Sequence, residues 1–151
     1  MKIALLFHVL GIVVWVGGMF FAYLALRPAA ALLLEPPQRL ALWQDTLRRF
    51  FNWVWLAIAF VLGSGLWMFF RMGGFTGAPM YVHAMLVLGL TMMGIFVHVF
   101  FGPFRRLTAN VAAKEWKSAG AALNQVRVRV ALNLALGLLT IAIATLLAAL
   151  L

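Results

Sequence analysis

Four long apolar stretches constrain the fold of this chain more than any other feature. They cover residues 3–26, 50–70, 80–101 and 128–151. A helix needs about 20 apolar residues to cross roughly 30 Å of hydrocarbon, and each stretch reaches that length. Helices are the expected form because each satisfies its own backbone hydrogen bonds in lipid. We therefore predict an all-α fold, a transmembrane four-helix up-down bundle that forms a single integral membrane domain over residues 1–151.

Composition supports the membrane class, since 66% of the 151 residues are hydrophobic and only 10% are charged. A soluble domain of this size would need more polar residues on its surface. The chain has no cysteine, which excludes disulfides and thiolate metal or iron–sulfur ligands. The first apolar stretch exceeds the roughly 7–15 residues of a signal-peptide core, so we expect a retained span.

The distribution of charge predicts the topology. The net charge is +9, and the basic residues gather in the connections 27–49 and 102–127, whereas the connection 71–79 carries only Arg71. By the positive-inside rule, the two basic connections face the cytoplasm of a bacterial inner membrane and both termini face the periplasm. Anionic lipid headgroups explain the charge better than nucleic acid does, so the lipid bilayer is the expected partner and no nucleic acid is expected.

Both basic connections are predicted to be amphipathic and partly helical. After two prolines, apolar residues recur at helical spacing, with charged and polar residues on the other faces: Leu40, Trp43, Leu47 and Phe50. This pattern suits either a membrane surface or a cytoplasmic extension of the second span. Residues 104–111 show a similar but weaker pattern.

All three histidines lie inside predicted spans, where ionisable groups are costly and usually face the bundle interior. The first and third spans run in the same direction, so His8 and His83 are expected at similar depth near the periplasmic boundary. His98 lies about 22 Å deeper than His83 and cannot join the pair at one metal ion. No carboxylate lies in a span, so a proton or cation path through paired acids is unsupported.

The surroundings of His8 and His83 suit a large flat ligand. Three residues follow His8 on its face of the helix: Gly11, Trp15 and Gly18. Glycines let a planar ring approach closely, and two histidines from two helices can clamp a haem iron. We predict haem b with His8 and His83 as axial ligands, and with Arg71 near enough to pair with a propionate.

Alternatives stay open for each histidine. His8 and His83 could instead form a copper site, because thioethers suit Cu(I) and the chain has eight methionines, although these are scattered and most are expected to be packing residues. A structural role, with glycines for helix packing and each histidine bonded to a carbonyl, is the other alternative. For His98, we prefer a polar cluster with Tyr23, Asn52 and Asn133 to a second metal or haem site.

Two segments resemble known membrane protein families. The sequence HVLGIVVWVGGMFFAYLALRP, residues 8–28, resembles the first helix of the CopD-like proteins, and YVHAMLVLG, residues 81–89, resembles the third helix of the HemJ-like protoporphyrinogen oxidases. The resemblance implies haem b for the HemJ relatives and copper handling for the CopD relatives. Met85 stands where the HemJ-like helix carries a lysine, so porphyrinogen oxidation ranks last among the expected functions.

The favoured function at this stage is a haem-b membrane protein that transfers electrons near the periplasmic face, an oxidoreductase if it acts as an enzyme. A quinone or a protein is the expected redox partner because the site lies at membrane depth, and a homo-oligomer is compatible with this function. Copper uptake or copper resistance is the second expectation, and protoporphyrinogen oxidation is the third.

Overall fold

The first half of the chain forms two long helical rods in the computed structural model, which describes residues 1–148. Helix α1 (Lys2–Phe21) continues through a π-helical segment, η1 (Ala22–Leu26), into α2 (Arg27–Leu33). Helix α3 (Pro36–Arg71) is a single helix of 36 residues. At about 1.5 Å per residue it is roughly 54 Å long, so it extends well beyond the hydrocarbon core of a bilayer.

The second half forms two further rods. The short helix α4 (Gly74–Gly77) leads into α5 (Met80–Phe101). Helix α6 (Pro103–Ala112) follows α5 after a break at Gly102, and α7 (Trp116–Ala148) completes the fold. A proline at the first position of α6 explains the break, because proline lacks the N–H that would continue the hydrogen bonding of α5.

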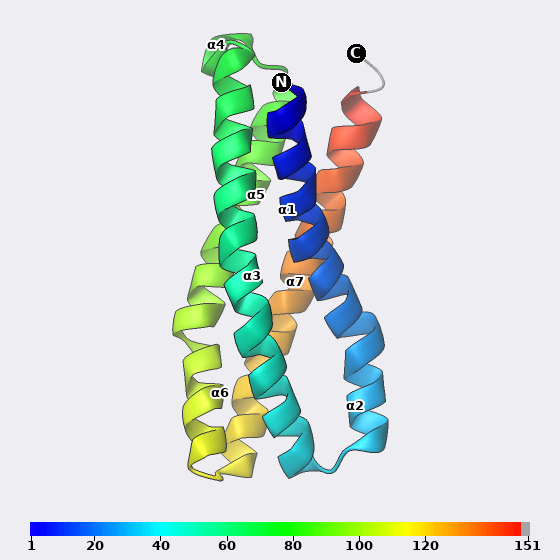
Figure 1. Ribbon diagram of the computed structural model, residues 1–151, viewed down its shortest axis with the longest axis vertical. Helices are drawn as coiled ribbons and strands as arrows, with labels where there is room; N and C mark the ends of the chain where they lie inside the picture. The colour runs from blue at the N-terminus through cyan, green and yellow to red at the C-terminus, as the bar shows by residue number, and fades with distance from the viewer. Residues whose placement is uncertain (149–151) are drawn as a thin grey trace.

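The fold confirms the predicted four-helix membrane class. Four rods are long and apolar enough to cross a membrane: residues 2–33, 36–71, 80–112 and 116–147. Neighbouring rods alternate in direction, and Figure 1 shows the start of α1 and the end of α7 at the end of the bundle that carries α4, with α2 and α6 at the other end. The predicted fourth span reached residue 151, and its residues 149–151 lie outside the described part of the chain.

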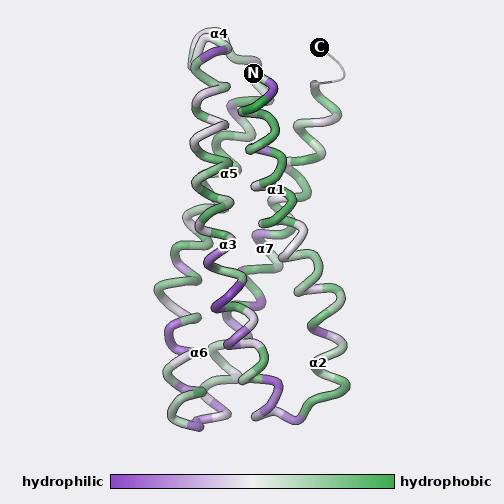
Figure 2. The backbone as a smooth tube through the Cα atoms, viewed as in Figure 1, coloured by the Kyte–Doolittle hydropathy of each residue, from purple (hydrophilic) through white to green (hydrophobic). Residues whose placement is uncertain are grey.

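The amphipathic segment before the second span extends that span as a helix. Leu40, Trp43 and Leu47 are buried against the bundle, as their spacing predicted. Asp45 on the same helix accepts hydrogen bonds from Arg48 and Arg49 at its exposed face. Figure 2 shows that hydrophilic residues concentrate at this end of the molecule, whereas the opposite half is mostly hydrophobic, with a few hydrophilic residues at the start of α1 and beside α4.

The order of the helices around the bundle decides which residues can meet. Helix α1 packs along α3, and α5 packs along α7, while α7 also contacts α1 and α3. Helices α1 and α5 therefore lie diagonally across the bundle (Figure 1). The predicted parallel direction of these two helices is confirmed, but equal depth on diagonal helices does not by itself bring two side chains together.

An aromatic cluster fills the middle of the bundle. Phe51 of α3 is only 2% exposed and packs edge-to-face on Phe96 of α5 and on Phe104 of α6, with ring centroids 5.3 and 4.9 Å apart. Trp15 of α1 packs edge-on against Phe96, with centroids 6.3 Å apart. Aromatic pairs of this kind add specific packing to the burial of apolar area, so the centre of the bundle is closed.

Candidate functional site

A cavity of about 240 Å³ lies between the four long helices, in the half of the bundle that holds both termini. Its lining comes from residues 5–16 of α1, from the second half of α3 and Met72 directly after it, from residues 81–93 of α5 and from the last part of α7. No charged side chain lines it, and its polar side chains are those of His8, Tyr81 and Thr140 together with the Trp15 indole. The aromatic cluster lies next to this cavity on the side toward α2 and α6.

His8 enters this cavity from α1 with a defined orientation. Its Nδ1 atom lies 3.0 Å from the hydroxyl oxygen of Ser64 on α3. The Ser64 hydroxyl donates its own hydrogen to the carbonyl of Phe60, so its oxygen accepts from the Nδ1–H of His8. The Nε2 atom then carries the free lone pair, which is the form of imidazole that binds a metal ion.

Gly65 provides the space for the His8 ring. A Cβ atom at position 65 would lie 3.0 Å from Cε1 of His8 and 3.4 Å from Nδ1. Glycine at this position lets the imidazole approach the backbone of α3, because a Cβ atom would force the ring to shift. Ser64 and Gly65 therefore fix the ring together, one by a hydrogen bond and the other by the absence of a side chain.

Methionines line the same cavity from two helices. Five of the eight in the chain do so: Met68 on α3, Met72 directly after the end of α3, and Met85, Met92 and Met93 on α5. The expectation that the methionines are scattered packing residues is thus incomplete, because the fold gathers these five around one space. Met80, by contrast, is 82% exposed and does not line the cavity.

His83 lies outside the cavity lining. Its Nδ1–H donates to the carbonyl of Pro79 at 3.1 Å, within the first turn of α5. Its ring packs edge-on against Phe69, which does line the cavity, with centroids 5.5 Å apart. The cavity is therefore lined by His8 and Trp15 but not by His83, which instead contacts the lining residue Phe69.

The predicted glycines serve the contact between α1 and α3. A Cβ at position 11 would lie 2.7 Å from a methyl group of Val61 and 3.0 Å from the carbonyl oxygen of Ala57. A Cβ at position 18 would overlap the ring of Phe50. Neither glycine lines the cavity, so both act in close helix packing, which was the alternative to ligand binding.

Comparison with known proteins identifies the family. The family model described as "CopD: Copper resistance protein D" matches residues 44–147, from within α3 to the end of α7. The chain belongs to the CopD family. No curated protein and no solved structure matches it significantly.

The match to CopD covers the helices that supply the methionines. It includes Ser64, Gly65 and all five cavity methionines, and it begins after α1, so His8 lies outside the matched residues. The predicted resemblance of the chain to the CopD-like proteins is confirmed. The description of the CopD family associates its members with copper, and the cavity is where this chain brings one imidazole and five thioether side chains to a common space.

Arg71 and His98 lie away from the cavity of this CopD chain. Arg71, at the end of α3, is exposed and lies over the ring of Trp67 at 5.7 Å. His98 and Asn52 are exposed on the outer surface, while Asn133 is buried and donates to the carbonyl of Met92. The polar cluster predicted around His98 is therefore not formed.

The cavity lining offers one imidazole and five thioether side chains and no carboxylate. Within residues 1–148 there is no group of three or more His, Cys, Asp and Glu side chains that could hold a metal. Hard divalent ions and Zn²⁺ therefore lack the oxygen, thiolate or multiple imidazole ligands they prefer. Thioether and imidazole groups are ligand types that suit Cu(I).

Some of these residues could have been found from the sequence. Met68 and Met72 are four residues apart, and Met85 and Met92 are seven apart, which places each pair on one helix face. Ser64 and Gly65 gave no comparable signal, because their roles depend on α1 lying against that turn of α3.

Proposed function

We propose that this CopD protein binds Cu(I) in the cavity, through Nε2 of His8 and thioether sulfurs of the surrounding methionines. One observation carries the proposal: a single oriented imidazole shares one uncharged cavity with five methionines. Imidazole and thioether ligands are neutral, so a bound Cu(I) keeps only one positive charge in an apolar environment. Such a site tolerates burial at membrane depth better than a divalent ion with the same ligands would.

The Ser64 hydroxyl supports this role. Metal-binding histidines usually donate their second ring N–H to a fixed acceptor, which sets the tautomer and the ring orientation. The contact of 3.0 Å between His8 and Ser64 has this arrangement. With Nδ1 bonded to Ser64, Nε2 is the ring nitrogen left to bind a metal ion.

We further propose that the cavity opens toward the periplasm, with copper handled in the outer half of the inner membrane. The support is the charge pattern: the basic connections lie at the end opposite the cavity, and basic ends face the cytoplasm. The aromatic cluster of Phe51, Phe96 and Trp15 closes the bundle below the cavity. Uptake into the cell would therefore require these rings to move, whereas sequestration of copper would not.

Anaerobic Cu(I) titration of the purified protein against a coloured chelator tests the proposal. The wild-type protein is expected to bind one Cu(I), and His8→Ala or the pair Met68→Leu and Met85→Leu is expected to lower the affinity. Met80→Leu is the matched control, because Met80 is exposed and outside the cavity. Equal affinities of wild type and the His8 and cavity-methionine variants would contradict the proposal.

Haem b with a redox role is the second candidate, favoured by the shared position of His8 and Trp15 on the cavity. The fit is poor in the present conformation. The volume of about 240 Å³ is below the roughly 300–1,000 Å³ typical of pockets for drug-sized ligands, and a haem macrocycle with its propionates is a large ligand. The second predicted axial ligand, His83, does not line the cavity. The visible spectrum of the protein expressed with ample haem distinguishes the candidates, because only haem gives a Soret band.

A further inference from the structure

One methionine of the cavity, Met92 on α5, is held in place twice by α7. It is 4% exposed and lines the cavity. Its backbone carbonyl accepts a hydrogen bond from the side-chain amide of Asn133, with 3.2 Å between the nitrogen and the oxygen. One turn further along α7, a Cβ atom at Gly137 would lie 3.1 Å from Cε of Met92. Asn133 therefore holds the backbone of Met92, and Gly137 leaves room for the end of its side chain.

Asn133 is an unusual residue for this bundle. Apart from indole groups, it is the only buried polar side chain among residues 1–148. A buried amide is costly in a membrane helix unless it bonds to a neighbouring helix, and within the described residues the bond to Met92 is the only one that Asn133 makes. Because Asn133 and Gly137 are four residues apart, they share one face of α7. This face fixes the position of Met92.

Met92 lies on the floor of the cavity, well below His8. The same Cβ atom at Gly137 would lie 2.9 Å from a methyl group of Val16 on α1, so the end of the Met92 side chain is close to Val16. Val16 follows His8 by eight residues, about 12 Å along the helix axis. Metal bonds to nitrogen and sulfur are about 2.0–2.3 Å long, as for zinc, so two ligands of one ion lie within roughly 5 Å of each other. One ion therefore cannot bind His8 and Met92 together.

Two other residues line the cavity near this floor. Met93 follows Met92 on α5, and Trp15 directly precedes Val16 on α1. Thioethers suit Cu(I), and an aromatic ring attracts a cation that lies within roughly 6 Å of its centre. The floor of the cavity thus offers groups that suit Cu(I) without an imidazole.

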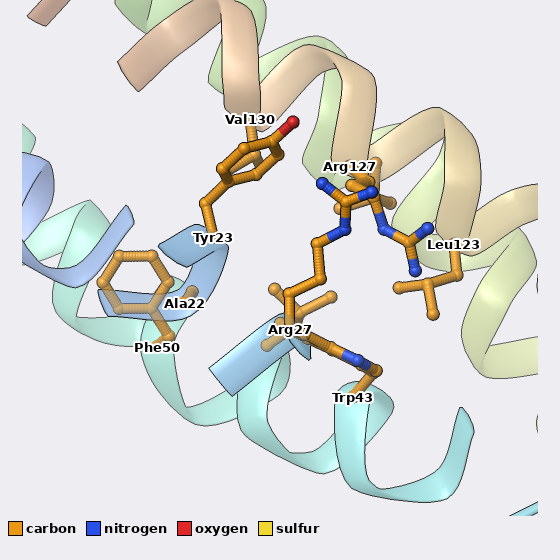
Figure 3. Close-up of a pocket in the computed structure, with 10 residues that line it drawn as sticks. Ala22, Tyr23, Arg27, Trp43, Phe50, Leu123, Arg127 and Val130 are labelled. Carbon is orange, nitrogen blue, oxygen red and sulfur yellow. The ribbon is translucent and has the colours of Figure 1, made fainter. Parts of the chain in front are cut away.

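The opposite end of the bundle offers no comparable position. A small pocket of about 30 Å³ lies there between η1, α3 and α7, and none of the methionines in residues 1–148 lines it. Arg27 and Arg127 do line it, and Figure 3 shows their guanidinium groups near each other. Their positive charges repel a cation, so this end does not provide a binding position for Cu(I).

We infer that Cu(I) has a second binding position on the floor of the cavity, where the sulfurs of Met92 and Met93 are its ligands. Asn133 and Gly137 are positioning residues, because they hold Met92 without touching the ion. The inference rests on the proposed function, since it concerns the same ion and the same cavity. Two Cu(I) ions in one uncharged cavity repel each other, so a single ion occupies either this position or the one at His8.

The variant His8→Ala isolates the floor position. Anaerobic titration of Cu(I) against a coloured chelator measures the copper that the variant retains, and X-ray absorption spectroscopy distinguishes nitrogen from sulfur ligands. The wild-type protein is expected to hold one Cu(I) with nitrogen and sulfur ligands. His8→Ala is expected to hold one Cu(I) more weakly and with sulfur ligands alone.

A second substitution in the His8→Ala background identifies the ligands. Met92→Leu should remove the retained Cu(I) and keep the fold, because leucine and methionine are close in volume. Met68→Leu is the matched control. Met68 lines the same cavity, but it lies one turn beyond Ser64, the partner of His8, on the side away from the floor. Met68→Leu should therefore leave the retained Cu(I) unchanged.

Gly137→Ala in the same background tests the positioning role. The new Cβ would displace the end of Met92, and loss of an outer contact of this kind typically lowers metal affinity roughly 10- to 100-fold. Gly94→Ala is the control, because Gly94 lies outside the cavity lining and a Cβ there meets nothing within 4 Å. Equal losses in the two variants would overturn the positioning role of Gly137.

The outcomes separate this inference from the proposed function. If the wild-type protein takes up no Cu(I), the proposed function fails and the second position fails with it. If the wild-type protein binds Cu(I) and a folded His8→Ala variant retains none, only the second position is overturned. It is also overturned if Met68→Leu removes the retained copper as completely as Met92→Leu does, since all the sulfurs would then belong to one site.

Discussion

His8 and Ser64 are 56 residues apart in the chain, and their side chains lie 3.0 Å apart between α1 and α3. The contact joins the only histidine of the cavity lining to a hydroxyl whose hydrogen is already committed to the Phe60 carbonyl. It sets which ring nitrogen of His8 can bind a metal ion. Two of the predictions below depend on this relationship.

Ser64→Ala should weaken Cu(I) binding while leaving the fold intact. The change removes the acceptor that fixes the tautomer of His8, and loss of such an outer contact typically costs roughly 10- to 100-fold in metal affinity. The chelator titration measures it. Ser118→Ala is the matched control, because Ser118 is exposed on α7. An unchanged affinity in Ser64→Ala would show that His8 does not need this hydrogen bond.

Gly65→Ala should weaken Cu(I) binding by displacing the ring. Its Cβ would lie 3.0 Å from Cε1 of His8, closer than ordinary van der Waals contact. Gly63→Ala, two residues earlier on the same helix, is the control, because a Cβ there meets nothing within 4 Å. If both alanines lower the affinity equally, the effect belongs to the helix backbone and not to His8.

Gly11→Ala should destabilise the protein without a specific effect on copper. The new Cβ would meet the Ala57 carbonyl at 3.0 Å and Val61 at 2.7 Å, and overpacking of this kind costs about 1–3 kcal/mol. Gly17→Ala, where nothing lies within 4 Å, should keep or slightly raise the wild-type melting temperature, because alanine is favoured over glycine inside a helix by about 0.5–1 kcal/mol. The melting temperatures in detergent check this pair. A normal melting temperature in Gly11→Ala would mean that α1 and α3 are not packed this closely.

The sequence predicted the four rods well because span length and hydropathy depend on local composition alone. For residues 36–49 the sequence was compatible with a helix on the membrane surface or with an extension of the second span. The structure shows the extension, because Leu40, Trp43 and Leu47 are buried against the bundle. The interior position of His8 was also predictable, since an ionisable group in lipid seeks the bundle interior.

The sequence did not predict which helices are neighbours in the bundle. Depth along an axis follows from residue number, and it gave His8 and His83 similar positions. Whether two parallel helices are neighbours or lie on the diagonal depends on packing across the bundle, and α1 and α5 lie on the diagonal. The same limit applies to Gly11 and Gly18, because a glycine that admits a ligand and one that admits a helix have the same sequence pattern.

Reporter fusions should place the carboxyl terminus in the periplasm and the turn near Glu115 in the cytoplasm. The reason is the gathering of arginine and lysine at the end of the bundle formed by α2, α6 and their connections. A phosphatase reporter, active only in the periplasm, and a fluorescent reporter, active only in the cytoplasm, measure the two positions. The reverse pattern would turn the cavity that His8 lines toward the cytoplasm and contradict the proposed direction of access.

His83→Ala should leave Cu(I) affinity unchanged, in contrast to His8→Ala. His83 donates to the Pro79 carbonyl and packs on Phe69, outside the cavity lining. Its loss removes one hydrogen bond at the start of α5, so a small decrease in stability, about 1 kcal/mol, is expected. Chelator titration and thermal unfolding of both variants separate the two effects.

The same pair of variants decides between the metal candidates. If the protein purifies with a six-coordinate haem spectrum that both His8→Ala and His83→Ala convert to another spin state, the two histidines are axial ligands after all. The helices would then have to rearrange to bring His83 past Phe69 into the cavity. If the protein is colourless and only His8→Ala lowers Cu(I) affinity, His8 acts with the methionines and His83 is structural.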